Sequence, residues 1–144
     1  MANSIINIDD FSSRMRSLAK AAGLDRVAAY HLTGSNRLAL THAWNCSKAA
    51  EINDELKFPA RLPLVADWLA ALSNGKCVNI SRANMTLDEA VFLCMFGIKA
   101  LYLTPVIKEG RLFGVLAFED HGSYRRFDEG CAAVFSDAAE SWSA

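Results

Sequence analysis

The sequence predicts an α+β fold in which a five- or six-stranded antiparallel sheet is sandwiched between helices. Three observations lead to this fold class. Hydrophobic periodicity changes along the chain in the order helix, two strands, helix, strand, helix, two strands, helix. The strands at 100–107 and 112–118 are apolar at nearly every position, which indicates that both faces of the sheet are covered. The first and last helices each carry an apolar stripe that fits such a cover.

The first third of the chain predicts a helix followed by a hairpin. Asp9 or Asp10 can cap a helix that Gly23 ends. Its apolar face carries Phe11, Met15, Leu18 and Ala22. Residues 26–32 and 38–44 then have the composition of strands, and the turn at 33–36 predicts that the two strands pair.

The middle of the chain predicts a loop, a helix and a short strand. Residues 45–61 are polar and irregular. Pro63 suits the first position of a helix, because its missing N–H costs nothing there. The apolar face of this helix carries Leu64, Val65, Trp68, Leu69 and Leu72. Gly75 ends the helix, and a strand follows at 77–80.

The last part of the chain predicts two more helices around a hairpin. Thr86 and Glu89 form a capping box for a helix that stops at Gly97. Gly110 supplies the positive φ that the tight loop between strands 100–107 and 112–118 needs. A final helix begins near Asp128, and its apolar stripe carries Cys131, Val134, Phe135, Ala138, Ala139 and Trp142.

Composition describes one ordinary domain. The chain has 144 residues, 15 basic and 16 acidic side chains and a net charge of −1, so we expect a single domain over residues 1–144. Near neutrality argues against a nucleic-acid surface and a polybasic membrane anchor. No apolar run approaches the roughly 18–20 residues that cross a bilayer, and no secretion signal opens the chain. We therefore expect a cytoplasmic protein without membrane insertion, whose four cysteines are reduced.

Five stretches stand out along the chain, at 23–30 (GLDRVAAY), 42–44 (HAW), 62–80, 96–118 and 124–129 (YRRFDE). Taken in this order, they resemble the GAF domain of sensor kinases and diguanylate cyclases, a small-molecule sensor module of bacterial signalling proteins. The most specific of them contains Gly-Ile, a central Pro and two spaced glycines, as in the core motif of the family. The resemblance covers nearly the whole chain and implies the fold predicted above.

The resemblance implies a non-catalytic sensory domain with a ligand pocket between the sheet and the helices. Six positions match the pocket lining of the family: Tyr30, Trp68, Phe92, Leu101, Leu103 and Glu119. Glu119 shares a strand face with Val115 and Ala117, so its carboxylate would favour a ligand with a donor or a cation. The identity of the ligand, and of any cofactor, stays unknown. Ligand binding would shift the population of two positions of the terminal helices.

Partners also follow from the resemblance. It implies a longer parent chain with an effector domain, and a homodimer formed through the N- and C-terminal helices. Met15 and Trp142 exceed what the outer sheet face can cover, so we expect them to contribute to pairing. A ligand-free dimerisation module is therefore the first alternative to a sensor.

Departures from the family pattern disfavour two known kinds of ligand. Ala100 stands where a serine is usual. The residues that mark cyclic-nucleotide-binding members are missing. Phytochrome-like members attach a bilin through a Cys-His pair, and Asp88 and Glu89 occupy the matching positions here. Covalent bilin attachment is therefore excluded.

The cysteines and histidines offer alternative chemistry. Cys46, in an expected exposed loop, is the best candidate for a thiol enzyme that acts on a small oxidised substrate, whereas Cys94 and Cys131 are expected as core side chains. His31, His42 and His121 are too scattered for a zinc site. One of them, such as His121, would be enough for a haem ligand.

One acidic run remains. The sequence Glu119-Asp120-His121 stands at a strand end and offers a carboxylate beside an imidazole, which suits acid–base chemistry. A run of this kind is more often the place where a strand meets solvent. No nucleophile, base and orienting group stand together, so we expect no enzyme activity.

Overall fold

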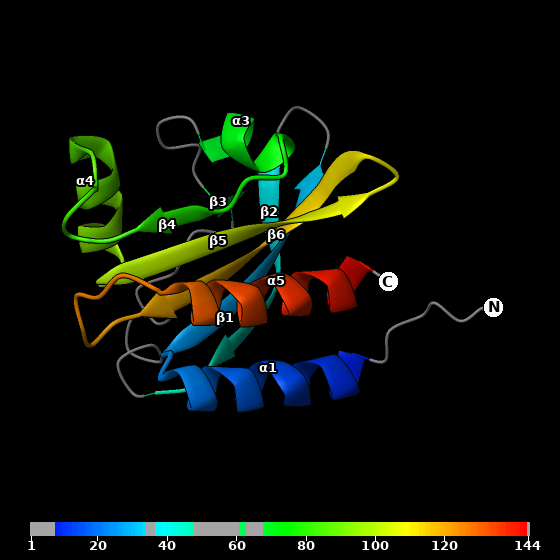
Figure 1. The fold of residues 1–144 in the computed structure, drawn as a ribbon, viewed down its shortest axis with the longest axis horizontal. Coiled ribbons are helices and arrows are strands. Elements are labelled where there is room, and N and C mark those ends of the chain that lie inside the picture. Colours follow the sequence, from blue (N-terminus) through cyan, green and yellow to red (C-terminus); the bar gives the residue numbers. More distant parts are fainter. Residues whose placement is uncertain (1–7, 34–36, 48–60, 63–67, 144) are drawn as a thin grey trace.

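Six strands form one antiparallel sheet with helices on both faces in the computed structural model of this chain (Figure 1). The structure describes residues 8–33, 37–47, 61–62 and 68–143. In chain order the elements are α1 (Ile8–Ala22), β1 (Arg26–Thr33), β2 (Arg37–Asn45), β3 (Arg61–Leu62), α3 (Trp68–Ser73), β4 (Val78–Ile80), α4 (Leu87–Met95), β5 (Ala100–Lys108), β6 (Arg111–Asp120) and α5 (Glu129–Ser143). The predicted fold class is confirmed.

The strand order is β3-β2-β1-β6-β5-β4, which makes β1 and β6 the central pair. These two strands run antiparallel, so the first residue of β1, Arg26, lies opposite Glu119 near the end of β6. The predicted pairing of β1 with β2 and of β5 with β6 is confirmed.

Two separate cores lie on the two faces of the sheet. Helices α1 and α5 pack side by side on one face, whereas α3 and α4 lie on the other (Figure 1). Successive residues of a strand alternate between the faces, so Ala28 belongs to the core under α3 and α4 and Ala29 to the core under α1 and α5. Strands β5 and β6 are apolar at nearly every position because both of their sides are buried.

Local signals set the ends of the elements as predicted. Gly23 ends α1 with a φ of 69°. Thr86 and Glu89 form the capping box of α4, in which each side chain accepts from the backbone N–H of the other residue. In the loop between β5 and β6 Gly110 has the expected positive φ of 75°, and Glu109 also has one, at 53°. Two residues with positive φ match the right-handed twist of the strands they join.

Several expectations are wrong in detail. Val134 is exposed, although it was placed on the apolar stripe of the last helix. Cys94 is also exposed, and Cys131 is only half-buried. Met15 and Trp142, expected to exceed the cover of the sheet, pack into the core under α1 and α5. Residues 34–36 of the first turn and residues 63–67 of the predicted second helix lie outside the described part.

Candidate functional site

The sheet face under α3 and α4 brings together the six residues that the sequence singled out. Tyr30 comes from β1, Leu101 and Leu103 from β5 and Glu119 from β6. Trp68 and Phe92, from α3 and α4, meet edge to face with ring centroids 5.6 Å apart. All six side chains are buried, and five of them belong to one hydrophobic cluster. The six residues therefore bring three aromatic rings and one carboxylate to this face.

A hydrogen bond joins the two helices that cover this face. The indole Nε1 of Trp68 donates to Oε2 of Glu89 at 2.6 Å, and Oε1 of the same carboxylate accepts from the backbone N–H of Thr86 at 2.8 Å. One buried carboxylate thus caps α4 and positions an aromatic side chain of α3. The sequence identified Glu89 as a capping residue but not as the partner of Trp68.

Glu119 stands in a buried ion cluster. Its Oε2 accepts from the Arg26 guanidinium at 2.8 Å, and its Oε1 lies 2.8 Å from Nε2 of His121. The side chains of Arg26 and His121 are 0% exposed and that of Glu119 is 2% exposed. A charge is stable in such a place only if it is paired, and the antiparallel register supplies the pair by placing Arg26 opposite Glu119.

This cluster corrects two expectations. The run 119–121 does not mark the point where a strand meets solvent, because all three residues are buried. Both oxygens of the Glu119 carboxylate also have protein partners, so this group does not present an uncompensated negative charge to a ligand. The argument that it would favour a cation on its own account is therefore wrong.

The neighbouring phenol is held in its neutral form. Burial raises the pKa of Tyr30, the Glu119 carboxylate raises this pKa further, and the charge and hydrogen bond of Arg26 act against both. Tyr30 is therefore a hydrogen-bonding group with a protonated hydroxyl at the edge of the aromatic cluster. Its hydroxyl and the ion cluster form the polar end of an otherwise apolar region.

Asp25 fixes the loop that carries His121. Its Oδ2 accepts from the backbone N–H of His121 at 2.5 Å, while its own N–H donates to the Glu119 carbonyl at 2.9 Å. Burial raises the pKa of Asp25, but hydrogen bonds with Ser47, His121 and Asp120 and the charge of His121 together outweigh that effect and hold the pKa below its ordinary value. The ends of β1, β2 and β6 are thereby tied together beside the cluster.

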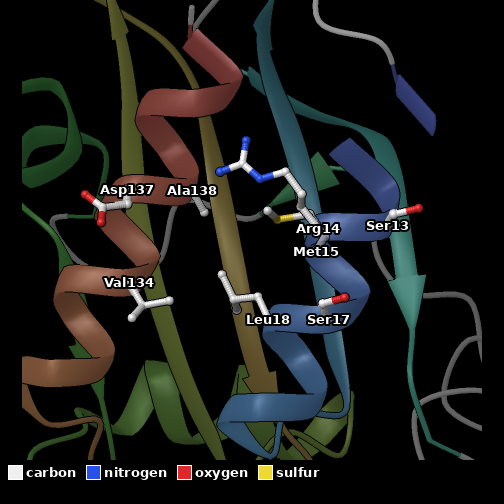
Figure 2. Close-up of a pocket in the computed structure, with 8 residues that line it drawn as sticks. All are labelled: Ser13, Arg14, Met15, Ser17, Leu18, Val134, Asp137 and Ala138. Atoms are coloured by element: carbon white, nitrogen blue, oxygen red, sulfur yellow. The ribbon is translucent and has the colours of Figure 1, made fainter. Parts of the chain in front are cut away.

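Cavities lined by described residues lie on other parts of the molecule. One is a groove of about 370 Å³ between α1 and α5, where Leu18 and Val134 project toward each other (Figure 2). Its lining residues are Ser13, Arg14, Met15, Ser17, Leu18, Val134, Asp137 and Ala138. None of the six predicted site residues lines this groove, so it is a second surface rather than part of the predicted pocket.

The structure gives little support for thiol or metal chemistry at the cysteines and histidines. Burial raises the pKa of Cys46, Asp25 also raises it, and the opposing effect of Arg16 is smaller than that of burial. Cys46 is therefore a poor nucleophile at neutral pH. Among the described residues, no group of three or more His, Cys, Asp or Glu side chains is arranged to hold a metal ion.

The opposite side of the sheet makes direct contact with α5 behind Tyr30. A Cβ on Gly114 would lie 3.1 Å from the Trp142 ring and 2.3 Å from the Tyr30 carbonyl oxygen. Only a glycine lets the α5 indole and the β1 backbone approach β6 so closely. Trp142 also contacts Phe11 of α1, with ring centroids 6.5 Å apart. The two terminal helices and the strand that carries Tyr30 thus meet around one glycine.

Comparisons with known proteins give one family. The family model of the GAF domain matches residues 9–141. No curated protein matches the sequence. No helix in the described part is long and apolar enough to cross a membrane.

Solved structures agree in fold. The blue-light-absorbing form of the PixJ GAF domain from Thermosynechococcus elongatus has a TM-score of 0.68 at 18% identity, and 94% of this chain and 84% of that chain are covered. A domain of a two-component sensor histidine kinase from Sinorhizobium meliloti also has a TM-score of 0.68, at 14% identity, with 96% and 89% covered. Free methionine-R-sulfoxide reductase from Neisseria meningitidis has a TM-score of 0.70 at 19% identity, with 94% and 75% covered.

Proposed function

We propose that this chain, which belongs to the GAF domain family, is a non-catalytic sensory domain that binds a small molecule between its sheet and helices α3 and α4. The observation that carries the proposal is the convergence of Tyr30, Trp68 and Phe92 with a buried ion cluster on one sheet face. Buried, paired charges beside aromatic rings are typical of sites that fix the orientation of a ligand.

The side chains indicate the kind of ligand. Trp68 and Phe92 offer ring faces and edges to an apolar or flat body. The Tyr30 hydroxyl and the Arg26–Glu119–His121 cluster offer both donors and acceptors at one end. We therefore expect a small molecule with an apolar body and one polar, hydrogen-bonding end, without a preference for a net positive charge.

The relay would pass through Gly114 to the terminal helices. A ligand that displaces Tyr30 moves the β1 backbone, whose carbonyl lies against Gly114, and Trp142 of α5 lies on the other side of that glycine. The first turns of α1 and the last turns of α5 are neighbours, since Arg14 donates to the Ser141 hydroxyl at 2.9 Å. A ligand that binds one arrangement better than another would then shift the position of both helices, and with it an effector domain in a longer parent chain.

Two adjacent alanines of β1 allow a matched test of ligand binding. Ala28→Val adds two methyl groups on the face under α3 and α4, and Ala29→Val adds the same groups on the opposite face. We expect compounds from a metabolite library that raise the melting temperature of the wild-type chain to lose this effect in Ala28→Val and to keep it in Ala29→Val. If no compound shifts the wild type and the purified protein shows no absorbing ligand, the binding part of the proposal is wrong.

Hydrogen exchange tests the relay separately. A compound that passes the first test should change amide exchange in residues 8–22 and 129–143 as well as in β1 and β6. If a compound binds but amide exchange in both terminal helices stays unchanged, the relay part of the proposal is wrong.

The groove between α1 and α5 favours a second function, homodimerisation. Val134 lines this groove and is 48% exposed, and the other lining residues come from both α1 and α5 (Figure 2). Because Met15 and Trp142 are core residues, Val134 is the better position for a test. Val134→Glu should convert a dimer to a monomer in size-exclusion chromatography with light scattering, while Ala133→Glu on the same helix should not. A chain that is monomeric before substitution rules out this pairing.

A thiol enzyme has less support than the sequence suggested. The reductase among the solved structures shares the fold at 19% identity, and likeness at that level is no argument for its chemistry. The raised pKa of Cys46 opposes nucleophilic attack by this side chain.

A further inference from the structure

The solvent side of α4 is apolar along its whole length. Leu87, Val91 and Met95 are 81%, 53% and 67% exposed and recur every four residues, which places them on one stripe. Within this helix Asp88 is the one exposed charged residue, because Glu89 is buried against Trp68. Scattered exposed apolar residues are ordinary, but three large ones in one row indicate a surface that another molecule covers.

A groove runs along the same helix. It has a volume of about 300 Å³, and its lining includes Ala90, Leu93 and Cys94 of α4 together with Tyr124. Helix α4, which carries the stripe and lines the groove, lies at the end of the molecule opposite the first turn of α1 and the last turn of α5 (Figure 1). This surface is therefore separate from the groove between those helices.

Two cations border the groove on the Tyr124 side. The guanidinium carbon of Arg82 lies 4.2 Å, and Nζ of Lys99 5.2 Å, from the centre of the Tyr124 ring. In the described part of the chain neither side chain has a carboxylate within ion-pair distance, and the nearby Asp120 is already paired with Arg125 at 2.8 Å. The lining of the groove thus combines apolar side chains of α4 with two cations, Arg82 and Lys99.

We propose that α4 and this groove form the docking surface for an acidic amphipathic helix of a partner protein. Its apolar residues would cover Leu87, Val91 and Met95 and enter the groove, and its carboxylates would pair with Arg82 and Lys99. Helices bind grooves in this way when apolar anchors recur at helical spacing. A second copy of this chain fits less well, because its α4 offers the two cations only Asp88 as an exposed carboxylate. The proposal does not depend on the ligand pocket.

A pair of synthetic peptides tests the charge requirement. Both carry leucines at helical spacing, and the flanking positions are glutamate in one peptide and lysine in the other. In fluorescence anisotropy the full chain should bind the glutamate peptide and not the lysine peptide. Arg82→Glu with Lys99→Glu should weaken binding of the first by about tenfold or more and create binding of the second, because opposite charges across an interface select the partner. Arg82→Glu alone should shift the affinities for the two peptides in the same directions, but by less.

Two further variants and one label locate the site. Val91→Glu should abolish binding of both peptides to any form of the chain, whereas Ala133→Glu, on the far helix α5, should leave it unchanged. Bound glutamate peptide should slow alkylation of Cys94, which lines the groove, and not that of Cys46. The proposal is overturned if neither peptide binds, if both bind equally, or if Cys94 is not protected. It is equally overturned if the chain self-associates through Val91, or if it binds lipid vesicles more tightly than the glutamate peptide in a Val91-dependent way.

Discussion

Arg26 and Glu119 face each other across the two central strands and form a 2.8 Å ion pair that solvent does not reach. They come from the first residue of β1 and the next-to-last residue of β6, 93 positions apart in the chain. Pairing in this register is what makes a charged side chain stable on a buried sheet face. The cluster therefore contributes to folding as well as to the proposed pocket.

Removal of one partner of this pair should be costly. We expect Arg26→Met and Glu119→Leu each to lower the free energy of unfolding by about 3–5 kcal/mol, because the remaining charge is buried without compensation. The double variant should lose clearly less than the sum of the two, with part of the loss due to His121. Urea denaturation measures all three variants, and Arg14→Ala, at an exposed site, should change stability by no more than about 0.5 kcal/mol. Additive losses in the double variant would show that the two side chains do not interact.

Any side chain at Gly114 should destabilise the fold. In Gly114→Ala the new Cβ would meet the Tyr30 carbonyl oxygen at 2.3 Å and the Trp142 ring at 3.1 Å. We expect a loss of about 1–3 kcal/mol in the free energy of unfolding and a changed Trp fluorescence spectrum. Gly122→Ala is the matched control, since its Cβ would come no closer than 3.7 Å to a neighbour. Equal stability of the two variants would contradict the close approach.

The fold could be predicted from the sequence because its signals are local. Capping at Thr86, the stop at Gly23 and the doubly apolar strands each concern residues within a few positions of one another. The exposed positions of Val134 and Cys94 could not be predicted in this way. An apolar stripe shows that a helix is amphipathic. Which residues at the edges of the stripe stay in solvent depends on the angle at which the helix packs on the sheet.

The sequence singled out the apolar residues of the candidate site and Glu119 with its neighbour His121, but it missed Arg26 as the partner of Glu119. Parity along the strand placed Glu119 on the pocket face, and the same rule applied to β1 would have placed Arg26 there with Ala28 and Tyr30. The register between β1 and β6, which makes Arg26 and Glu119 a pair, cannot be read from the sequence. The Trp68–Glu89 hydrogen bond could not be predicted either, because it joins residues 21 positions apart on two helices that meet only in the tertiary structure.

Asp25 should make stability depend on pH in acid. Its pKa in the folded state lies below the ordinary value of 3.8, so its contribution is present above that value and is lost as pH falls through the folded pKa. Asp25→Asn should therefore be less stable than wild type at pH 7, with a difference that shrinks below about pH 4. Urea midpoints at pH 7, 5, 4 and 3 give this comparison, and the difference between wild type and Ser13→Ala should stay constant. A difference for Asp25→Asn that grows in acid would show that the carboxylate is not stabilised by folding.

Cys46 should react slowly with alkylating reagents at neutral pH. Partial burial and the charge of Asp25 raise the pKa of this thiol above its ordinary value of 9.0, against the smaller effect of Arg16. Since the thiolate is the reacting species, the rate with iodoacetamide should still be rising at pH 9 and should stay below that of a free thiol at pH 7. Mass spectrometry of tryptic peptides follows Cys46 separately from the other three cysteines. Arg16→Ala should slow the reaction further, because it removes the opposing positive charge, whereas fast alkylation at pH 7 would restore the thiol enzyme as a competing function.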